Sequence, residues 1–136
     1  MYKLIIAGLG VLAVALLAMG CGGGGSDEAT AQVSKAEFYK QARAVCTKTW
    51  KAILAESEAA KTNAASYSKM APLLEHEAED LEAISGPKAV EEEVKPLIAN
   101  VLKASRLIAQ KGEAGATDPS VEAYKAEAIA LHLGTC

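Results

Sequence analysis

The stretch "SKAEFYKQARAVCTKTWKAILAES", residues 34–57, decides the fold because it reads as one amphipathic helix with a defined beginning. The hydroxyl of Ser34 can cap the helix while Glu37 reaches back to the Ser34 amide, which is a capping box. Apolar or small side chains recur at helical spacing on one face, which predicts a surface that packs against other helices; they are Phe38, Ala42, Val45, Thr49 and Ile53. Cys46 falls at the edge of this face, where it could meet the carboxyl terminus.

A second stripe of large side chains runs beside this face and consists of Tyr39, Arg43, Trp50 and Leu54. Two interpretations stay open for it. Exposed aromatic and Arg side chains are the composition of a protein-interaction hot spot. A wide apolar face also arises where one helix packs against two neighbours, and the stripe would then be structural.

Three further helical segments follow, rich in Ala, Leu, Glu and Lys and without an alternating β-branched run. We expect helices over about 67–84, over 88–111, and from a cap at Thr117 or Asp118 to a stop at Gly134. Pro96 lies in the second of these segments, on the side away from its apolar stripe, and either bends that helix or breaks it in two. Four amphipathic helices with short connections predict an all-α, antiparallel four-helix bundle over residues 34–136.

Residues 1–20 read as an export signal. Lys3 precedes an uncharged apolar run of about sixteen residues, from Leu4 to Met19. A bilayer-spanning helix needs roughly 20 such residues, whereas a short positive head, an apolar stretch and small residues before a cleavage site describe a signal peptide. A retained membrane anchor is the alternative.

The signal ends in Ala18, Met19 and Gly20 directly before Cys21, which resembles the lipobox of bacterial lipoproteins. The resemblance implies that the Cys21 thiol receives a diacylglycerol, that residues 1–20 are removed, and that the new amino terminus is acylated, for example with palmitate. Two or more acyl chains give a durable hold on a bilayer. An ordinary disulfide at Cys21 is the alternative. Residues 21–33 are Gly-rich and poor in large apolar side chains, which predicts a flexible tether.

Without residues 1–20 the chain carries 13 basic and 17 acidic side chains, because only Lys3 is lost from the 14 and 17 of the whole sequence. This mildly acidic balance provides no basic face for nucleic acid and no polybasic patch for anionic lipid. We therefore expect the cell membrane to be reached through the lipid on Cys21, with the domain facing outside the cytoplasm.

Cys46 and Cys136 remain in the exported part. An even pair of cysteines in an oxidising compartment is a candidate disulfide, which would tie the first helix to the last residue. A pair of free thiols, or of metal ligands, is the alternative.

Glu77 is the sharpest candidate for chemistry. Helical phasing places it in the middle of the apolar stripe of the helix expected over about 67–84, where a carboxylate would be desolvated and its pKa raised. A carboxylate at a loose bundle end, or one paired with Lys or Arg from another helix, is the alternative.

A metal site is a weaker hypothesis. His76 and Glu79 stand three residues apart, and together with Asp80 and His132 they could form a site between two helices. Glu79 points outward when the stripe faces the core, so we expect solvated polar residues here, with no metal and no cofactor.

The lipobox, the Gly/Ser tether, the segment "SKAEFYKQARAVC" and the "LGTC" that follows Tyr124 together resemble small lipoproteins of actinobacterial type. The resemblance implies a helical domain closed by one disulfide, and it supplies no activity. The chain has no serine elbow, no phosphate-binding glycine loop, and no histidine-rich or carboxylate-paired set with the spacing of a catalytic site.

We therefore expect a lipid-anchored, extracytoplasmic helical module of the cell envelope that binds an envelope protein or a small ligand and has no catalytic activity. The alternative is a metal- or haem-binding envelope sensor bundle that uses His76, His132 and nearby carboxylates.

Overall fold

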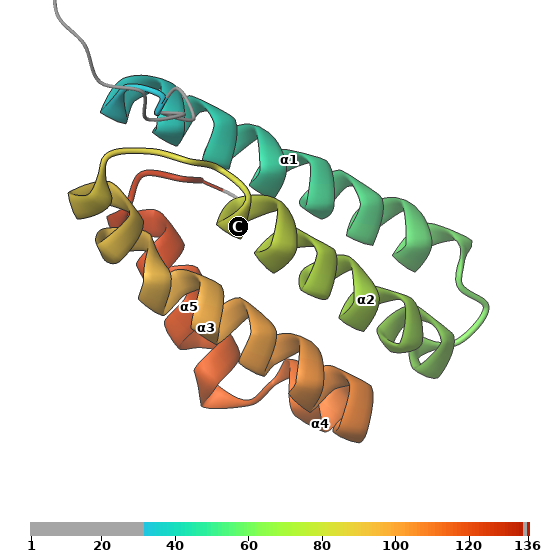
Figure 1. Cartoon of the computed structure of the whole chain (residues 1–136). Coiled ribbons are helices and arrows are strands. Elements are labelled where there is room, and N and C mark those ends of the chain that lie inside the picture. The colour runs from blue at the N-terminus through green and yellow to red at the C-terminus, as the bar shows by residue number, and fades with distance from the viewer. Residues whose placement is uncertain (1–31, 135) are drawn as a thin grey trace, which may run out of the picture.

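The computed structural model describes residues 32–134 and residue 136, and these residues form helices and no strand (Figure 1). The helices are α1 (Lys35–Ala59), α2 (Asn63–Glu82), α3 (Lys88–Lys111), α4 (Glu113–Ala116) and α5 (Pro119–Ala130). The expected signal peptide, Cys21 and the tether up to residue 31 lie outside the described residues. Within the described part of the chain, no helix is both long and apolar enough to span a membrane.

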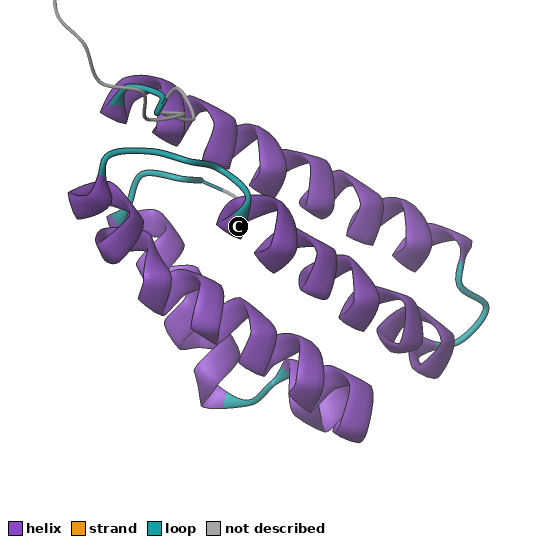
Figure 2. Ribbon diagram, in the orientation of Figure 1, coloured by secondary structure: helices purple, strands orange, loops and turns teal. Residues whose placement is uncertain are grey.

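The four long helices run alternately up and down, joined by short loops (Figure 2). α2 lies between α1 and α3, and α3 also contacts α4 and α5. The expected all-α antiparallel bundle is confirmed, with α4 as one additional turn between the third and fourth long helices.

A side-chain cap sets the beginning of α1. The Glu37 amide donates a hydrogen bond to Oγ of Ser34 at 3.2 Å, which satisfies one of the free amides of the first turn. The reciprocal half of the expected capping box does not form, because the Glu37 carboxylate instead accepts hydrogen bonds from Lys40 and Gln41.

Caps also set the beginnings of α2 and α5. α2 begins four residues before the predicted position 67, because Oγ1 of Thr62 accepts from the Ala65 amide at 3.2 Å. At α5, Asp118 is the cap, and its carboxylate accepts from the Ser120 amide at 3.0 Å.

α3 is one continuous helix with Pro96 inside it, so the proposed break does not occur. Pro96 is exposed, as is Pro72 inside α2. A proline removes one helical hydrogen bond and crowds the preceding turn. Because both prolines lie on the solvent side, neither helix loses contact with its neighbours. The buried stripes of α2 and α3 hold the two helices in place.

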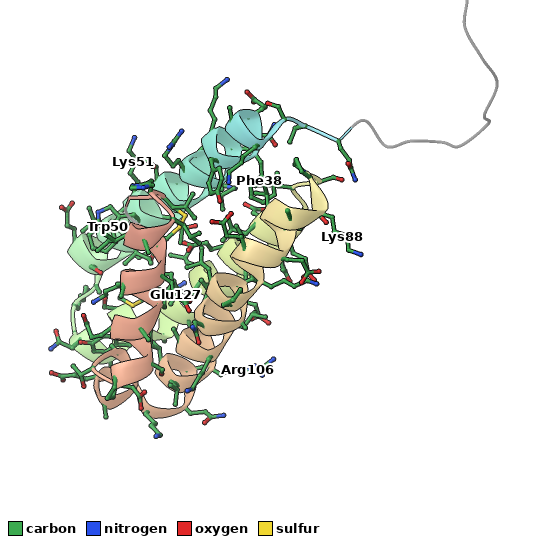
Figure 3. The ribbon with its side chains drawn as sticks, turned by 90° about the vertical axis from the view of Figure 1, so that its left-hand side faces the viewer. Phe38, Trp50, Lys51, Lys88, Arg106 and Glu127 are labelled. Carbon is green, nitrogen blue, oxygen red and sulfur yellow. A yellow bond between two sulfur atoms is a disulfide. The ribbon has the colours of Figure 1, made fainter. Side chains whose placement is uncertain are left out.

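The core is formed mainly by aliphatic side chains of α1, α2 and α3, and its bulkiest members are Phe38, Leu81, Leu97 and Leu133. Figure 3 shows Phe38 enclosed between α1 and the beginning of α3. On α1 one detail of the prediction is wrong: Cys46 is fully buried, with 0% of its surface exposed, and Val45 is only half-buried. Both residues satisfy helical spacing from Ala42 to Thr49, so contacts with other helices decide between them.

α5 ends at Ala130, four residues before the expected stop at Gly134. The chain turns where His132 adopts a φ of 56°. The Leu133 amide then donates to the Ala128 carbonyl at 2.9 Å, and the His132 amide donates to the Ile129 carbonyl at 3.0 Å. This is the Schellman arrangement, in which a left-handed residue closes the helix.

The segment after α5 is anchored by Leu133, which is buried, whereas Leu131 is only half-buried. Gly134 follows with a φ of 79°, a conformation that glycine adopts without strain. The expected disulfide is confirmed: Cys136 is bonded to Cys46 of α1, and their Cα atoms are 4.4 Å apart. In the chain-entropy model a bridge between cysteines 90 positions apart stabilises the fold by about 4.5 kcal/mol.

Candidate functional site

A pocket of about 310 Å³ lies among the long helices and the α4 turn. Its walls are mostly apolar and include Ile53, Met70, Leu74, Ile108 and Val121. Trp50 stands at its opening with 44% of its surface exposed, and it projects on the left-hand side of the molecule in Figure 3. This volume is at the lower end of the range for small-molecule sites.

Glu77 is the buried acidic group of this pocket. It comes from the buried face of α2, and only 1% of its surface is exposed. The hydroxyl of Tyr124 on α5 donates a hydrogen bond to Oε1 of Glu77 at 3.1 Å, and the Thr49 side chain of α1 lies near enough to the carboxyl group to favour its ionised form. Side chains of α1 and α5 therefore surround a carboxyl group that comes from α2.

Burial controls the protonation of this site. Desolvation raises the pKa of Glu77 from its ordinary 4.5 to about 7, against the smaller lowering effect of the hydrogen bonds from Tyr124 and Thr49. The same burial, together with the negative charge of Glu77, raises the pKa of Tyr124, which keeps its proton. Near neutral pH the pocket can therefore present either a neutral acid or a carboxylate to a molecule inside it.

The disulfide lies against the same carboxyl group. Sγ of Cys46, Sγ of Cys136 and a carboxylate oxygen of Glu77 are all within 4.8 Å of one another. Cys136 also lines the pocket. The structure thus brings together Glu77 and the cysteine pair, which the sequence presented as separate candidates.

The two histidines lie elsewhere. His76 is exposed and its Nδ1 is 3.0 Å from a carboxylate oxygen of Glu79, whereas His132 is exposed in the turn after α5. Asp80 pairs with Lys48 of α1 at 3.0 Å. Over residues 32–134 and 136, the one group of three close metal-ligand side chains is formed by the two bridged cysteines and Glu77, so it includes neither histidine.

The stripe beside the core face of α1 divides into two parts. The Tyr39 hydroxyl donates to Glu93 of α3 at 2.9 Å, and Arg43 donates to the His132 carbonyl oxygen at 3.5 Å, so these two residues tie α1 to other segments. Trp50 and Leu54 are exposed at 44% and 43%. Of the four, Trp50 alone lines the pocket.

A second hollow, of about 490 Å³, lies near the beginning of α1, between the α2–α3 loop and α3. Phe38, Ile84 and Ile98 line it. Of its charged residues, Glu82 and Lys95 are exposed, and the half-buried Glu91 already accepts a hydrogen bond from the Gly86 amide at 2.9 Å. It contains no buried polar side chain that could select a ligand, so the pocket around Glu77 is the stronger candidate.

Three parts of the site were absent from the sequence-based prediction: Tyr67, Met70 as a wall residue, and the role of Tyr124 as a hydrogen-bond donor. Tyr124 carries a hydroxyl group on the apolar face of one helix, and Glu77 carries a carboxylate on the apolar face of another. This signal could have paired the two residues, because buried Tyr hydroxyls need a partner.

Comparisons with known protein families, with curated proteins and with solved structures give no match for this chain.

Proposed function

We propose that this chain is a lipid-anchored binding module on the outer side of a bacterial membrane, which holds a small, largely apolar ligand in the pocket around Glu77 and catalyses no turnover of it. The observation that carries the proposal is the combination of an apolar pocket with one buried, hydrogen-bonded carboxyl group at its wall. Such pockets bind through apolar contact and gain specificity from a few placed polar groups.

The chemistry of the wall defines the ligand class. A molecule that fits contacts Met70, Leu74 and Val121 with its apolar body and offers one hydrogen-bonding group to Glu77. A neutral hydroxyl or amide meets the protonated acid, and an amine meets the carboxylate. An amine ligand would lower the pKa of Glu77, because an opposite charge favours the ionised form.

The position of the pocket supports access while the chain is tethered. The described chain enters the domain at Val33, whose amide donates to the Ser85 carbonyl at 3.1 Å. Trp50 lies fifteen residues along α1 from Lys35, which is about 22 Å at 1.5 Å per residue. The pocket opening is thus well separated from the end of the domain that a tether on Cys21 would hold near the bilayer.

The proposed lipid anchor is tested by mass spectrometry of the protein recovered from cell membranes. The proposal expects a chain that begins at residue 21, carries acyl chains on Cys21, and retains the Cys46–Cys136 bridge. A protein that still begins at Met1 with an unmodified Cys21 would refute the lipid anchor and leave the pocket to be judged separately.

The pocket is tested with N-phenyl-1-naphthylamine, an apolar aromatic amine that becomes fluorescent in apolar surroundings. The assay uses the chain from Gly22 onward without detergent, because micelles would take up the dye. Trp50→Ala should weaken binding about tenfold, since loss of a large aromatic contact costs on the order of 1–2 kcal/mol.

Leu54→Ala is the matched control, because Leu54 is equally exposed on α1 but does not line the pocket. It should bind the dye as the wild type does. Equal effects of the two substitutions, or no saturable binding by the wild type, would contradict the proposed site.

A further inference from the structure

The Cys46–Cys136 bridge is asymmetric. Cys46, in the middle of α1, is fully buried and does not line the pocket. Cys136 is partly buried and does line it. A small molecule in the pocket therefore meets the Cys136 side of the bridge, while the other sulfur stays inside the core.

Asymmetry of this kind decides the direction of thiol–disulfide exchange. A thiolate attacks one sulfur of a disulfide, and the electron pair of the broken bond leaves on the other sulfur. Attack from the pocket on Cys136 makes Cys46 the leaving group. Because Cys46 is excluded from water, its thiolate would be strongly disfavoured there unless a nearby group supplies a proton.

Glu77 is placed to supply that proton. One of its carboxylate oxygens lies within 4.8 Å of both sulfur atoms, which is within reach of proton transfer through one water molecule that enters with the attacking thiol. The Tyr124 hydroxyl donates a hydrogen bond to the carboxyl group. Both Tyr124 and Thr49 favour the ionised form of Glu77, so they stabilise the carboxylate that proton transfer leaves behind.

Among the described residues that line the pocket, Lys125 is the one basic side chain. The buried residues of α3 carry no charge. Lys125 lines the pocket, but its ammonium group pairs with Glu122 at 2.8 Å. The titratable groups that face Glu77 are Tyr124 of α5 and, once the bridge is open, Cys46 of α1 and Cys136 of the C-terminal segment.

We propose that the bridge is a thiol-exchange site, at which a low-molecular-weight thiol attacks Sγ of Cys136 from the pocket and Glu77 protonates the departing Sγ of Cys46. The thiolate sulfur forms a bond to Sγ of Cys136 as the bond between the cysteines breaks. The electron pair goes to Sγ of Cys46, which takes the proton of Glu77. The products are a mixed disulfide on Cys136, a neutral Cys46 thiol and an ionised Glu77.

This inference goes beyond the proposed ligand binding and does not depend on it, since the exchange is a stoichiometric modification of the protein and requires no membrane anchor. It assigns to Glu77 the role of a proton donor, in addition to that of a hydrogen-bonding group.

The test uses the full chain as it is recovered from cells, with glutathione as the attacking thiol. Fluorescence of Trp50, the only tryptophan in the chain and a neighbour of Cys136 at the pocket, follows the reaction. Rate constants are divided by the thiolate fraction of glutathione at each pH. The wild type should react at least tenfold faster at pH 6 than at pH 8.5, with an inflection near 7.

Glu77→Gln should react at least tenfold more slowly than the wild type at pH 6, and its corrected rate should not change with pH. The comparison at pH 6 separates proton donation from charge repulsion, because protonated Glu77 and Gln are both neutral but only the acid transfers a proton. Glu75→Gln, which changes an exposed carboxylate of the same helix, should keep the wild-type profile.

Should Glu77→Gln fail to fold, Tyr124→Phe provides the test. It removes the hydrogen bond that lowers the pKa of Glu77, so the inflection should move to higher pH. Peptide mapping should locate glutathione on Cys136. An adduct on Cys46, or pH profiles that coincide for wild type and Glu77→Gln, would overturn the proposal. So would an unmoved inflection in Tyr124→Phe. A rate that is independent of glutathione concentration would also overturn it, because the bridge would then react only after unfolding.

Discussion

Glu77 should make the stability of the domain fall as pH rises through neutrality. Its pKa is about 7 in the folded protein and about 4.5 when it is exposed to solvent, so the folded state binds the proton more tightly between those values. The stabilisation that results is fully present below pH 4.5 and is lost as pH rises through 7. Each pKa unit corresponds to 1.36 kcal/mol, so the total loss is about 3 kcal/mol.

Glu77→Gln measures this contribution. Glutamine has nearly the same shape and keeps an oxygen that can accept from Tyr124, but it cannot ionise. The free energy of unfolding of each protein is measured in urea by circular dichroism from pH 4 to pH 8.5, with the disulfide intact. Glu37 and Asp118, whose pKa values are lowered, titrate in both proteins and cancel in the difference.

The free energy of unfolding of the wild type minus that of the Glu77→Gln variant should therefore decline by about 3 kcal/mol between pH 4.5 and pH 8. The variant should then be the more stable protein in mild alkali. Glu75→Gln, on the exposed side of α2, should give a difference close to zero at every pH. A difference between wild type and Glu77→Gln that stays constant across this range would show that Glu77 is solvated or ion-paired, and both the stability argument and the proton-donor argument would fail.

Two backbone positions give further predictions. A Cβ at the buried Gly115 would collide with the carbonyl oxygen of Leu107 in α3, so Gly115→Ala should lower the free energy of unfolding by about 2–3 kcal/mol; an unchanged free energy of unfolding would contradict the close contact. His132 holds a φ of 56° that glycine adopts freely, so His132→Gly should raise the melting temperature, with a gain of about 0.5–1 kcal/mol; a lower melting temperature would show that the side chain supports the turn.

Much of the fold could be predicted because helices are encoded locally. The bounds of α3, the Ser34 cap and the Asp118 cap all follow from residues within one or two turns of each other. The beginning of α2 was misplaced because Thr62 was not recognised as a cap. The end of α5 was misplaced because a histidine, and not Gly134, takes the left-handed position.

Less of the candidate site could be predicted. Periodicity alone pointed to Glu77, since it lies on the apolar stripe of its helix. The hydroxyl partners of Glu77 come from α1 and α5, at sequence separations that no local pattern records. The pocket wall also mixes residues from separate helices, so its volume and chemistry could not be anticipated.

The sequence by itself determined that this chain is helical, where most helices begin, and that Cys46 and Cys136 form a candidate pair. Only the tertiary structure decided that Cys46 and not Val45 faces the core, because both positions satisfy helical spacing and the neighbouring helices select one rotation of α1. That rotation places the bridge beside Glu77. The protonation of a carboxyl group depends on the solvent, dipoles and charges around it, and here those surroundings are supplied by segments far apart in the chain.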